Sequence, residues 1–199
     1  MIIENPNRKS QVNLFKELAF QSIHRTGISD LITFCEESDF FIAPASTKYH
    51  GAYVGGLLDH SLEVYYQALR LCNSFGYEIG KDGNNESLTI VSLFHDLCKT
   101  NSYTQEEKNV KNEETGLWEK QTVWKYNEKG NTFGAHGASS LYHIQNFIRL
   151  TEDEASAIYH HMGQWDASKY DNLSFVYEYN RLAWILHVAD EAATYIAHI

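Results

Sequence analysis

Apolar side chains recur at helical intervals along most of this chain. Between positions 10 and 24 they stand mostly three or four residues apart, which predicts a helix that ends before Gly27. The stretch 87–99 is almost wholly apolar, as is typical of a helix at the centre of a domain. We therefore expect an all-α helical bundle, whose other helices are predicted over 31–37, 57–75, 135–149, 152–161 and 175–197.

The segment 101–133 interrupts this helical pattern, because Glu, Lys, Asn and Gln dominate it. Strand-forming residues follow one another from Thr122 to Tyr126, and a turn is expected at Gly116. We expect a β-hairpin around residues 105–130, inserted into the bundle. A solvated surface loop and a lid beside a functional site are both open interpretations of this insertion.

Length and composition indicate one domain over residues 1–199, with the helices of 1–47 packed on its core. The formal net charge is −10, and Lys and Arg form no long cluster. A duplex nucleic acid is therefore a disfavoured partner. A small phosphorylated substrate stays open, because a bound metal can invert the local charge.

Three scattered cysteines and the absence of a long apolar run indicate a cytoplasmic protein without a membrane partner. Cys35, Cys72 and Cys98 form no close motif, so we expect reduced thiols. The first residues lack the charged and apolar regions of a signal peptide, and no apolar run reaches about 18 residues. The pattern gives no indication of the oligomeric state.

The candidate chemistry centres on the pair His95-Asp96, at the end of the apolar helix. Roughly half a His-Asp pair is expected by chance in this composition, so the context must carry the argument. Converging helices can assemble a metal site from widely spaced ligands. Divalent ions in such a site polarise a phosphoryl group and lower the pKa of a bound water. The other candidates stand in or at the ends of separate predicted helices: His60, His136, His160, His161 and Asp190.

In four segments the chain resembles the HD superfamily of metal-dependent phosphohydrolases. The likeness covers roughly residues 48–191 and is greatest to the HD domain of a Gram-positive bacterial 3′-to-5′ exoribonuclease. Two departures count against an RNA substrate: residues 1–47 are too short for the OB-fold module of that enzyme, and the insertion is long. The segments are Gly55-Gly56-Leu57-Leu58-Asp59-His60, Phe94-His95-Asp96-Leu97-Cys98-Lys99, His160-His161-Met162-Gly163 and Leu186-His187-Val188-Ala189-Asp190.

The resemblance implies a site for one or two divalent metal ions, with Asp96 as the bridging carboxylate. Imidazole and carboxylate ligands together suit Mn, Fe, Ni, Co, Zn or Mg. His161 is a further candidate that ranks behind its neighbour His160, because neighbouring residues on a helix differ by about 100° and rarely face one ion. The implied ligands are His60, His95, Asp96 and Asp190, with His136 and His160 added in two-metal members of the superfamily.

Three more residues are implied or expected at the substrate. Lys99 lies where the superfamily usually has a lysine near the phosphate, so Asp96 and Lys99 are the expected catalytic residues. His50 and Tyr53 precede the first ligand in an irregular stretch, and they are candidates to line the substrate cleft.

The leading hypothesis is a hydrolase that cleaves a phosphate ester of a nucleotide or another small phosphorylated molecule. One alternative is a phosphodiesterase or exonuclease acting on single-stranded RNA or DNA ends, with Trp118, Trp124 and Tyr126 of the hairpin stacking on bases. Another alternative is a non-catalytic HD module that binds a nucleotide.

Overall fold

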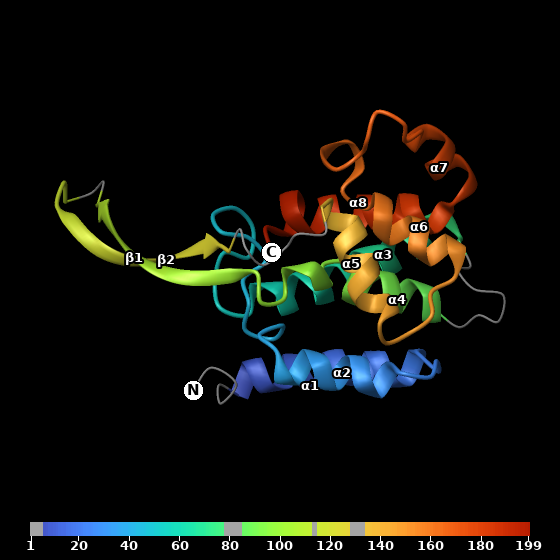
Figure 1. Ribbon diagram of the computed structural model, residues 1–199, viewed down its shortest axis with the longest axis horizontal. Helices are drawn as coiled ribbons and strands as arrows, with labels where there is room; N and C mark the ends of the chain where they lie inside the picture. The colour runs from blue at the N-terminus through green and yellow to red at the C-terminus, as the bar shows by residue number, and fades with distance from the viewer. Residues whose placement is uncertain (1–5, 78–84, 113–114, 128–133) are drawn as a thin grey trace.

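The structure is a computed structural model that describes residues 6–77, 85–112, 115–127 and 134–199. It is mostly helical, with one antiparallel two-stranded sheet, as the sequence predicts (Figure 1). The helices and strands are α1 (Pro6–Ser22), α2 (Ile28–Glu37), α3 (Gly56–Phe75), α4 (Glu86–Phe94), β1 (Tyr103–Lys111), β2 (Trp118–Tyr126), α5 (His136–Gln145), α6 (Glu152–His160), α7 (Leu173–Tyr179) and α8 (Arg181–Ala192). Short turns η1 (Leu97–Lys99), η2 (Gly163–Trp165) and η3 (Ala193–Ala197) connect or extend them.

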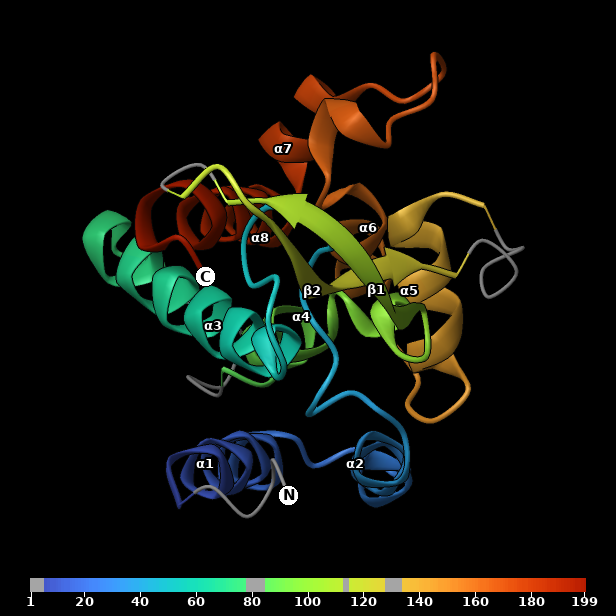
Figure 2. The same cartoon turned by 90° about the vertical axis from the view of Figure 1, so that its left-hand side faces the viewer.

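Helix α4 forms the centre of the bundle, where every residue from Leu88 to Phe94 is buried. Helices α1, α3, α6 and α8 pack around it. Helices α1 and α2 lie together along one side of the bundle (Figures 1 and 2). Phe15 of α1 packs edge-on against Phe94 of α4, with ring centroids 5.5 Å apart. The aromatic contact thus fixes the first helix to the element that carries His95.

Two predicted helices are interrupted. The prediction of one helix over 87–99 is wrong, because α4 ends at Phe94 and the chain tightens into η1 after Asp96. The prediction of one helix over 175–197 is also wrong, because extended backbone at Asn180 separates α7 from α8. The Asn180 side chain accepts a hydrogen bond from the backbone of Ala183 and so caps α8. The start of α6 is as predicted: Thr151 and Glu154 form a capping box.

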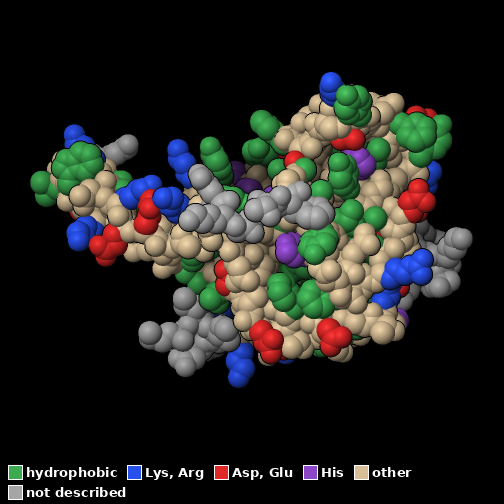
Figure 3. Space-filling model, viewed as in Figure 1, with side chains coloured by type: hydrophobic (Ala, Val, Ile, Leu, Met, Phe, Trp, Pro, Cys, Tyr) green, Lys and Arg blue, Asp and Glu red, His purple; other side chains and the backbone are tan. Residues whose placement is uncertain are grey.

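The hairpin projects from the helical body as an isolated ribbon (Figure 1). Its strands pair from Tyr103 opposite Tyr126 to Lys111 opposite Trp118. The predicted hairpin around 105–130 is therefore present, although residues 113–114 of its turn and 128–133 after it lie outside the described part. Figure 3 shows hydrophobic side chains beside Lys or Arg at its outer end, where Trp118 is exposed.

Close backbone approach brings two site-bearing helices together. A Cβ atom at Gly137 in α5 would overlap the backbone oxygen of Tyr159 in α6. Only glycine permits this approach, which sets the start of α5 beside the end of α6. His136 and His161 consequently face each other, with ring centroids 5.6 Å apart. Among the described residues, no helix is both long and apolar enough to span a membrane.

Candidate metal centre

Six side chains from separate elements meet beside α4, and we call them the histidine–aspartate cluster. Three of its imidazoles, those of His60, His95 and His161, are fully buried, and Asp96 is almost fully buried. Burial of so many ionisable groups is costly unless they are paired or coordinate a cation. The members are His60 in α3, His95 and Asp96 after α4, His136 at the start of α5, His161 after α6 and Asp190 in α8.

Backbone hydrogen bonds fix the orientation of the three fully buried imidazoles. In each ring, Nδ1–H donates to a carbonyl oxygen, so Nε2 carries a free lone pair directed into the cluster. This is the arrangement that metal-binding histidines need. The acceptors for His60, His95 and His161 are the backbone oxygens of Ile199, Ser92 and Ile158, at 3.0, 2.9 and 2.6 Å.

The converging Nε2 atoms fit a cation. Nε2 of His60 lies 3.3 Å from Nε2 of His95, and two free lone pairs at this distance repel each other. Nε2 of His161 is buried and has no hydrogen-bond partner among the described residues. The ligand atoms of His60, His95 and Asp190 lie within 4.8 Å of one another. These three side chains could together hold one cation.

The two oxygens of Asp96 face different histidines. Oδ1 lies 2.6 Å from Nε2 of His136 and 3.7 Å from Nε2 of His161. Oδ2 lies 3.4 Å from Nε2 of His95 and 3.6 Å from Nε2 of His60. A carboxylate between two sets of nitrogen donors has the geometry needed to bridge two ions.

Both carboxyl groups of the cluster are held ionised. Burial opposes ionisation of Asp96, but the charge of Lys99 and the neighbouring histidines outweigh it, so the pKa of Asp96 lies well below its usual range. Burial likewise opposes ionisation of Asp190, and the adjacent His60, with Nε2 3.1 Å from Oδ1 of Asp190, overcomes it, so the pKa of Asp190 is also lowered. The cluster therefore offers two anionic ligands at neutral pH.

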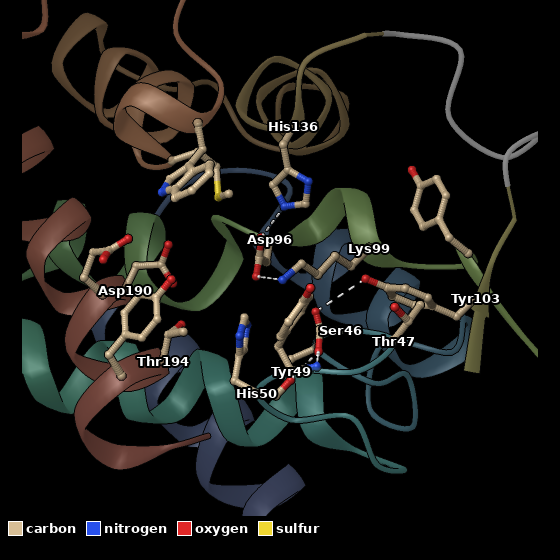
Figure 4. Close-up of a pocket in the computed structure, with 16 residues that line it drawn as sticks. Ser46, Thr47, Tyr49, His50, Asp96, Lys99, Tyr103, His136, Asp190 and Thr194 are labelled. Carbon is tan, nitrogen blue, oxygen red and sulfur yellow. Dashed lines mark hydrogen bonds and ion pairs between the residues drawn. The ribbon is translucent and has the colours of Figure 1, made fainter. Parts of the chain in front are cut away.

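A cleft of about 710 Å³ opens onto the cluster (Figure 4). Asp96, His136 and Asp190 reach its surface, and Lys99 extends along it with Nζ 2.6 Å from Oδ2 of Asp96. Burial opposes the charge of Lys99, but Asp96 more than compensates, so the pKa of Lys99 is raised. A cation is thus held at the surface of the cleft, beside the cluster.

His50, also expected at the substrate, lies in this cleft. Its ring packs against that of His60, with centroids 5.0 Å apart, and neither ring nitrogen has a hydrogen-bond partner among the described residues. Burial, with the charges of His60 and Lys99, lowers the pKa of His50 to about 4. The neutral imidazole therefore offers one donor and one acceptor to a ligand.

Residues 57–195 match the HD domain family, which is more than half of the chain. This chain belongs to the HD domain family. A 65-residue stretch is 32% identical to the dihydroneopterin 2′,3′-cyclic phosphate phosphodiesterase of Methanocaldococcus jannaschii. That stretch is 33% of this chain but 26% of the relative, so the chain spans about a quarter of the relative's length. No solved structure matches the chain.

The histidine–aspartate cluster contains His161, whereas His160 lies outside it. Nδ1 of His160 donates to the backbone oxygen of Ser156 at 2.8 Å, and its ring packs against Tyr159. Here the structure departs from the expectation that favoured His160. A sequence signal for His161 exists, because it continues the buried face of α6, whose other members follow Glu154 at helical spacing, so that His161 stands seven residues after Glu154. That face consists of Glu154, Ala157, Ile158 and His161.

Tyr53 lies outside the cleft, and Cys98 has a contact that the sequence did not predict. The Tyr53 hydroxyl donates to Oδ2 of Asp59, which also pairs with Arg8, and Tyr53 does not line the cleft. Sequence reasoning assigned Cys98 no role, yet its Sγ lies 3.5 Å from both ring nitrogens of His136. Its place two residues after Asp96 was the available signal.

Proposed function

We propose that this HD-domain protein is a metal-dependent phosphohydrolase that cleaves a phosphate ester of a nucleotide or another small phosphorylated molecule. The observation that carries the proposal is the convergence of three buried, backbone-oriented imidazoles with Asp96 and Asp190 at the floor of a cleft. Membership of the HD family and the similarity to a phosphodiesterase indicate a hydrolase. A binding module would not require this ligand set.

The residues suit two neighbouring ions that share Asp96. When bound, divalent ions would polarise the phosphoryl group and lower the pKa of a water molecule. The donor set of imidazole and carboxylate is compatible with Mn, Fe, Co, Ni, Zn or Mg. One ion would be held by His60, His95, Asp96 and Asp190, and the other by Asp96, His136 and His161.

The remaining side chains would hold and activate the ester. Lys99 is charged beside Asp96, so its ammonium can donate to a phosphoryl oxygen and offset charge that develops in the transition state. His50 lines the same cleft (Figure 4) and can donate a second hydrogen bond to the ester. In the reaction a water oxygen bonds to phosphorus, the ester P–O bond breaks, and the alcohol leaves with a proton.

A second candidate is hydrolysis at the ends of single-stranded RNA or DNA. The strand register favours it, because alternate residues share a face and the pairs Tyr103–Tyr126 and Lys111–Trp118 lie on the same one, together with Trp124. Tyr103 and Tyr126 line the cleft, so this aromatic face begins there. The net charge of −10 and the ion pair between Lys120 and Glu107 on that face weigh against a long polyanion.

The variant Asp96→Asn tests the proposal, because it removes the bridging charge while keeping the shape of the side chain. We expect bound metal to fall and activity to drop by about 1,000-fold or more, as for other groups that act as a unit in catalysis. The measurement is metal content by mass spectrometry, with hydrolysis of nucleoside monophosphates and short single-stranded oligonucleotides after loading with Mn²⁺, Co²⁺ or Ni²⁺.

Asp30→Asn, on the exposed first turn of α2, is the matched control and should retain both properties. Full metal-dependent activity in Asp96→Asn would refute the assignment. Metal binding without hydrolysis of any ester by the unaltered protein would favour the non-catalytic module instead.

A further inference from the structure

Aromatic side chains from separate segments surround the mouth of the cleft. Tyr103 and Tyr126, at the base of the hairpin, pack against each other with ring centroids 5.7 Å apart. Trp165 in η2 and Tyr195 in η3 also line the cleft, but 79% and 59% of their surfaces are exposed. Within the described residues neither of these two rings packs against another ring. Exposed rings in a concave site are typical of ligand recognition.

The same cleft has few positive charges. Lys99 is the one Lys or Arg among the described residues that line it, against the carboxylates of Asp96, Asp190 and Glu191. Its lining therefore has a formal charge of −2 with histidines neutral. Two divalent ions would bring this to +2, which matches the dianion of one phosphomonoester. A triphosphate would bring about four negative charges, and its outer phosphates would find no Arg or Lys partner here.

We propose that the cleft selects esters that carry a single phosphate group on a molecule with a planar aromatic ring, and that Trp165 and Tyr195 hold the ring. The inference rests on the proposed function for the position of the phosphate. The volume of about 710 Å³ suits a ligand of nucleoside monophosphate size, within the common range of about 300–1,000 Å³. The metal centre then determines the reaction, and the rings at the mouth of the cleft, those of Trp165 and Tyr195, determine which substrate binds.

The test compares four esters with the metal-loaded protein. They are a nucleoside 5′-monophosphate, a nucleoside 2′,3′-cyclic monophosphate, a nucleoside triphosphate and glycerol phosphate. We expect kcat/KM to be about 10-fold or more higher for the esters that combine a base with one phosphate, since one base–aromatic contact is worth a factor of this size. The two monophosphate arms distinguish a monoester from a cyclic diester.

The variants Trp165→Ala and Tyr195→Ala should raise KM for the preferred nucleotide about 10-fold, and should lower kcat/KM for this nucleotide more than kcat/KM for glycerol phosphate. Tyr170→Ala is the matched control, because Tyr170 is 83% exposed and lies outside the cleft lining. Equilibrium dialysis of the nucleoside monophosphate measures the ring contact independently of turnover. Its dissociation constant should rise in the two cleft variants alone.

Equal kcat/KM for glycerol phosphate, preference for the triphosphate, or binding by Trp165→Ala and Tyr195→Ala equal to that of Tyr170→Ala would overturn the inference while leaving a phosphohydrolase. Absence of hydrolysis of every ester would instead overturn the proposed function. In that case the dialysis experiment still decides whether the aromatic mouth binds the ring.

Discussion

Two clusters of buried charged side chains in this molecule differ in whether the protein itself supplies all their hydrogen-bond partners. The first, which we call the Arg25–Glu154 cluster, joins the α1–α2 turn to the starts of α4 and α6. Glu154 is fully buried, and Arg25 donates to both of its oxygens, at 2.5 and 2.6 Å. Ser87 and the backbone of Thr151 donate to the same carboxylate, at 2.6 and 2.8 Å. Every partner that Glu154 needs is supplied by the protein.

The histidine–aspartate cluster is filled only in part. Backbone oxygens orient three of its imidazoles, those of His60, His95 and His161. Yet Nε2 of His161 has no hydrogen-bond partner among the described residues, and Nε2 of His60 faces Nε2 of His95. Such an arrangement costs free energy in a metal-free protein. The comparison teaches that burial of charge alone does not identify a functional site. A better indicator is a set of lone pairs without hydrogen-bond partners that the surrounding backbone orients toward one point.

The largest effect that separates the two clusters is expected from Glu154→Gln. The substitution leaves Arg25 with Glu86 alone, whose Oε2 lies 3.4 Å from Nε of Arg25. We therefore expect a cost at the lower end of the range of about 3–5 kcal/mol for breaking a buried pair. For a chain of this size the melting temperature should fall by about 10 °C. Urea unfolding and calorimetry in the presence of a chelator measure the change.

Glu152→Gln, an exposed position on the first turn of the same helix, is the control and should be close to neutral. Metal content and kcat of folded Glu154→Gln should match the unaltered protein. Loss of metal binding in this variant would contradict the separation of a structural cluster from a functional one.

The next largest effect is expected from substitution of the adjacent histidines His160 and His161, measured as metal affinity or activity. His161→Ala removes an oriented Nε2 from the cluster, so we expect metal affinity or activity to fall by about 100-fold, the upper end of the loss seen when support of a metal site is removed. His160→Ala should leave both unchanged, because its Nδ1 is bonded within α6 and it does not reach Asp96. Metal titration of the two variants at one pH makes the comparison.

Unfolding in a chelator supplies the control for this pair, since His161 is buried and its removal also leaves a cavity. A stability loss without a change in metal affinity would assign His161 a packing role. Equal metal loss in both variants would show that the end of α6 moves when the ion binds.

The sequence predicts the elements better than the places where they break. Thr151 and Glu154 mark the start of α6 because a capping box is a local interaction between near neighbours. The break at Asn180 depends on the Asn180 side chain bonding to the backbone of Asp153, 27 residues away, as well as capping α8. No local pattern contains that contact, so one continuous helix was expected.

For the candidate site, too, the sequence does not predict what depends on contacts between distant segments. His60, His95, Asp96, His136 and Asp190 meet as expected, because the spacing of motifs identifies which helices carry ligands. The choice between His160 and His161 depends on how α6 rotates about its axis, which its packing against α5 and α8 decides. The position of Tyr53 was not predictable, because its hydrogen-bond partner Asp59 is also held by Arg8, 51 residues away along the chain.

The smallest expected effect is the pH dependence of the Arg25–Glu154 cluster. Burial opposes ionisation of Glu154, but hydrogen bonds from Arg25 and Ser87 outweigh it and lower its pKa below the ordinary value of 4.5. The unfolded chain therefore takes up this proton at a higher pH than the folded protein. The ionised pair contributes stability above pH 4.5, and this contribution is lost as the pH falls through the folded pKa.

The stability advantage of the unaltered protein over Glu154→Gln should narrow below pH 4.5 by at most about 1.4 kcal/mol per pH unit. Urea unfolding of both proteins in a chelator, between pH 3 and 6, measures this difference. An advantage that stays constant over that range would show that Glu154 acts through the hydrogen bonds that both of its oxygens accept rather than through its charge.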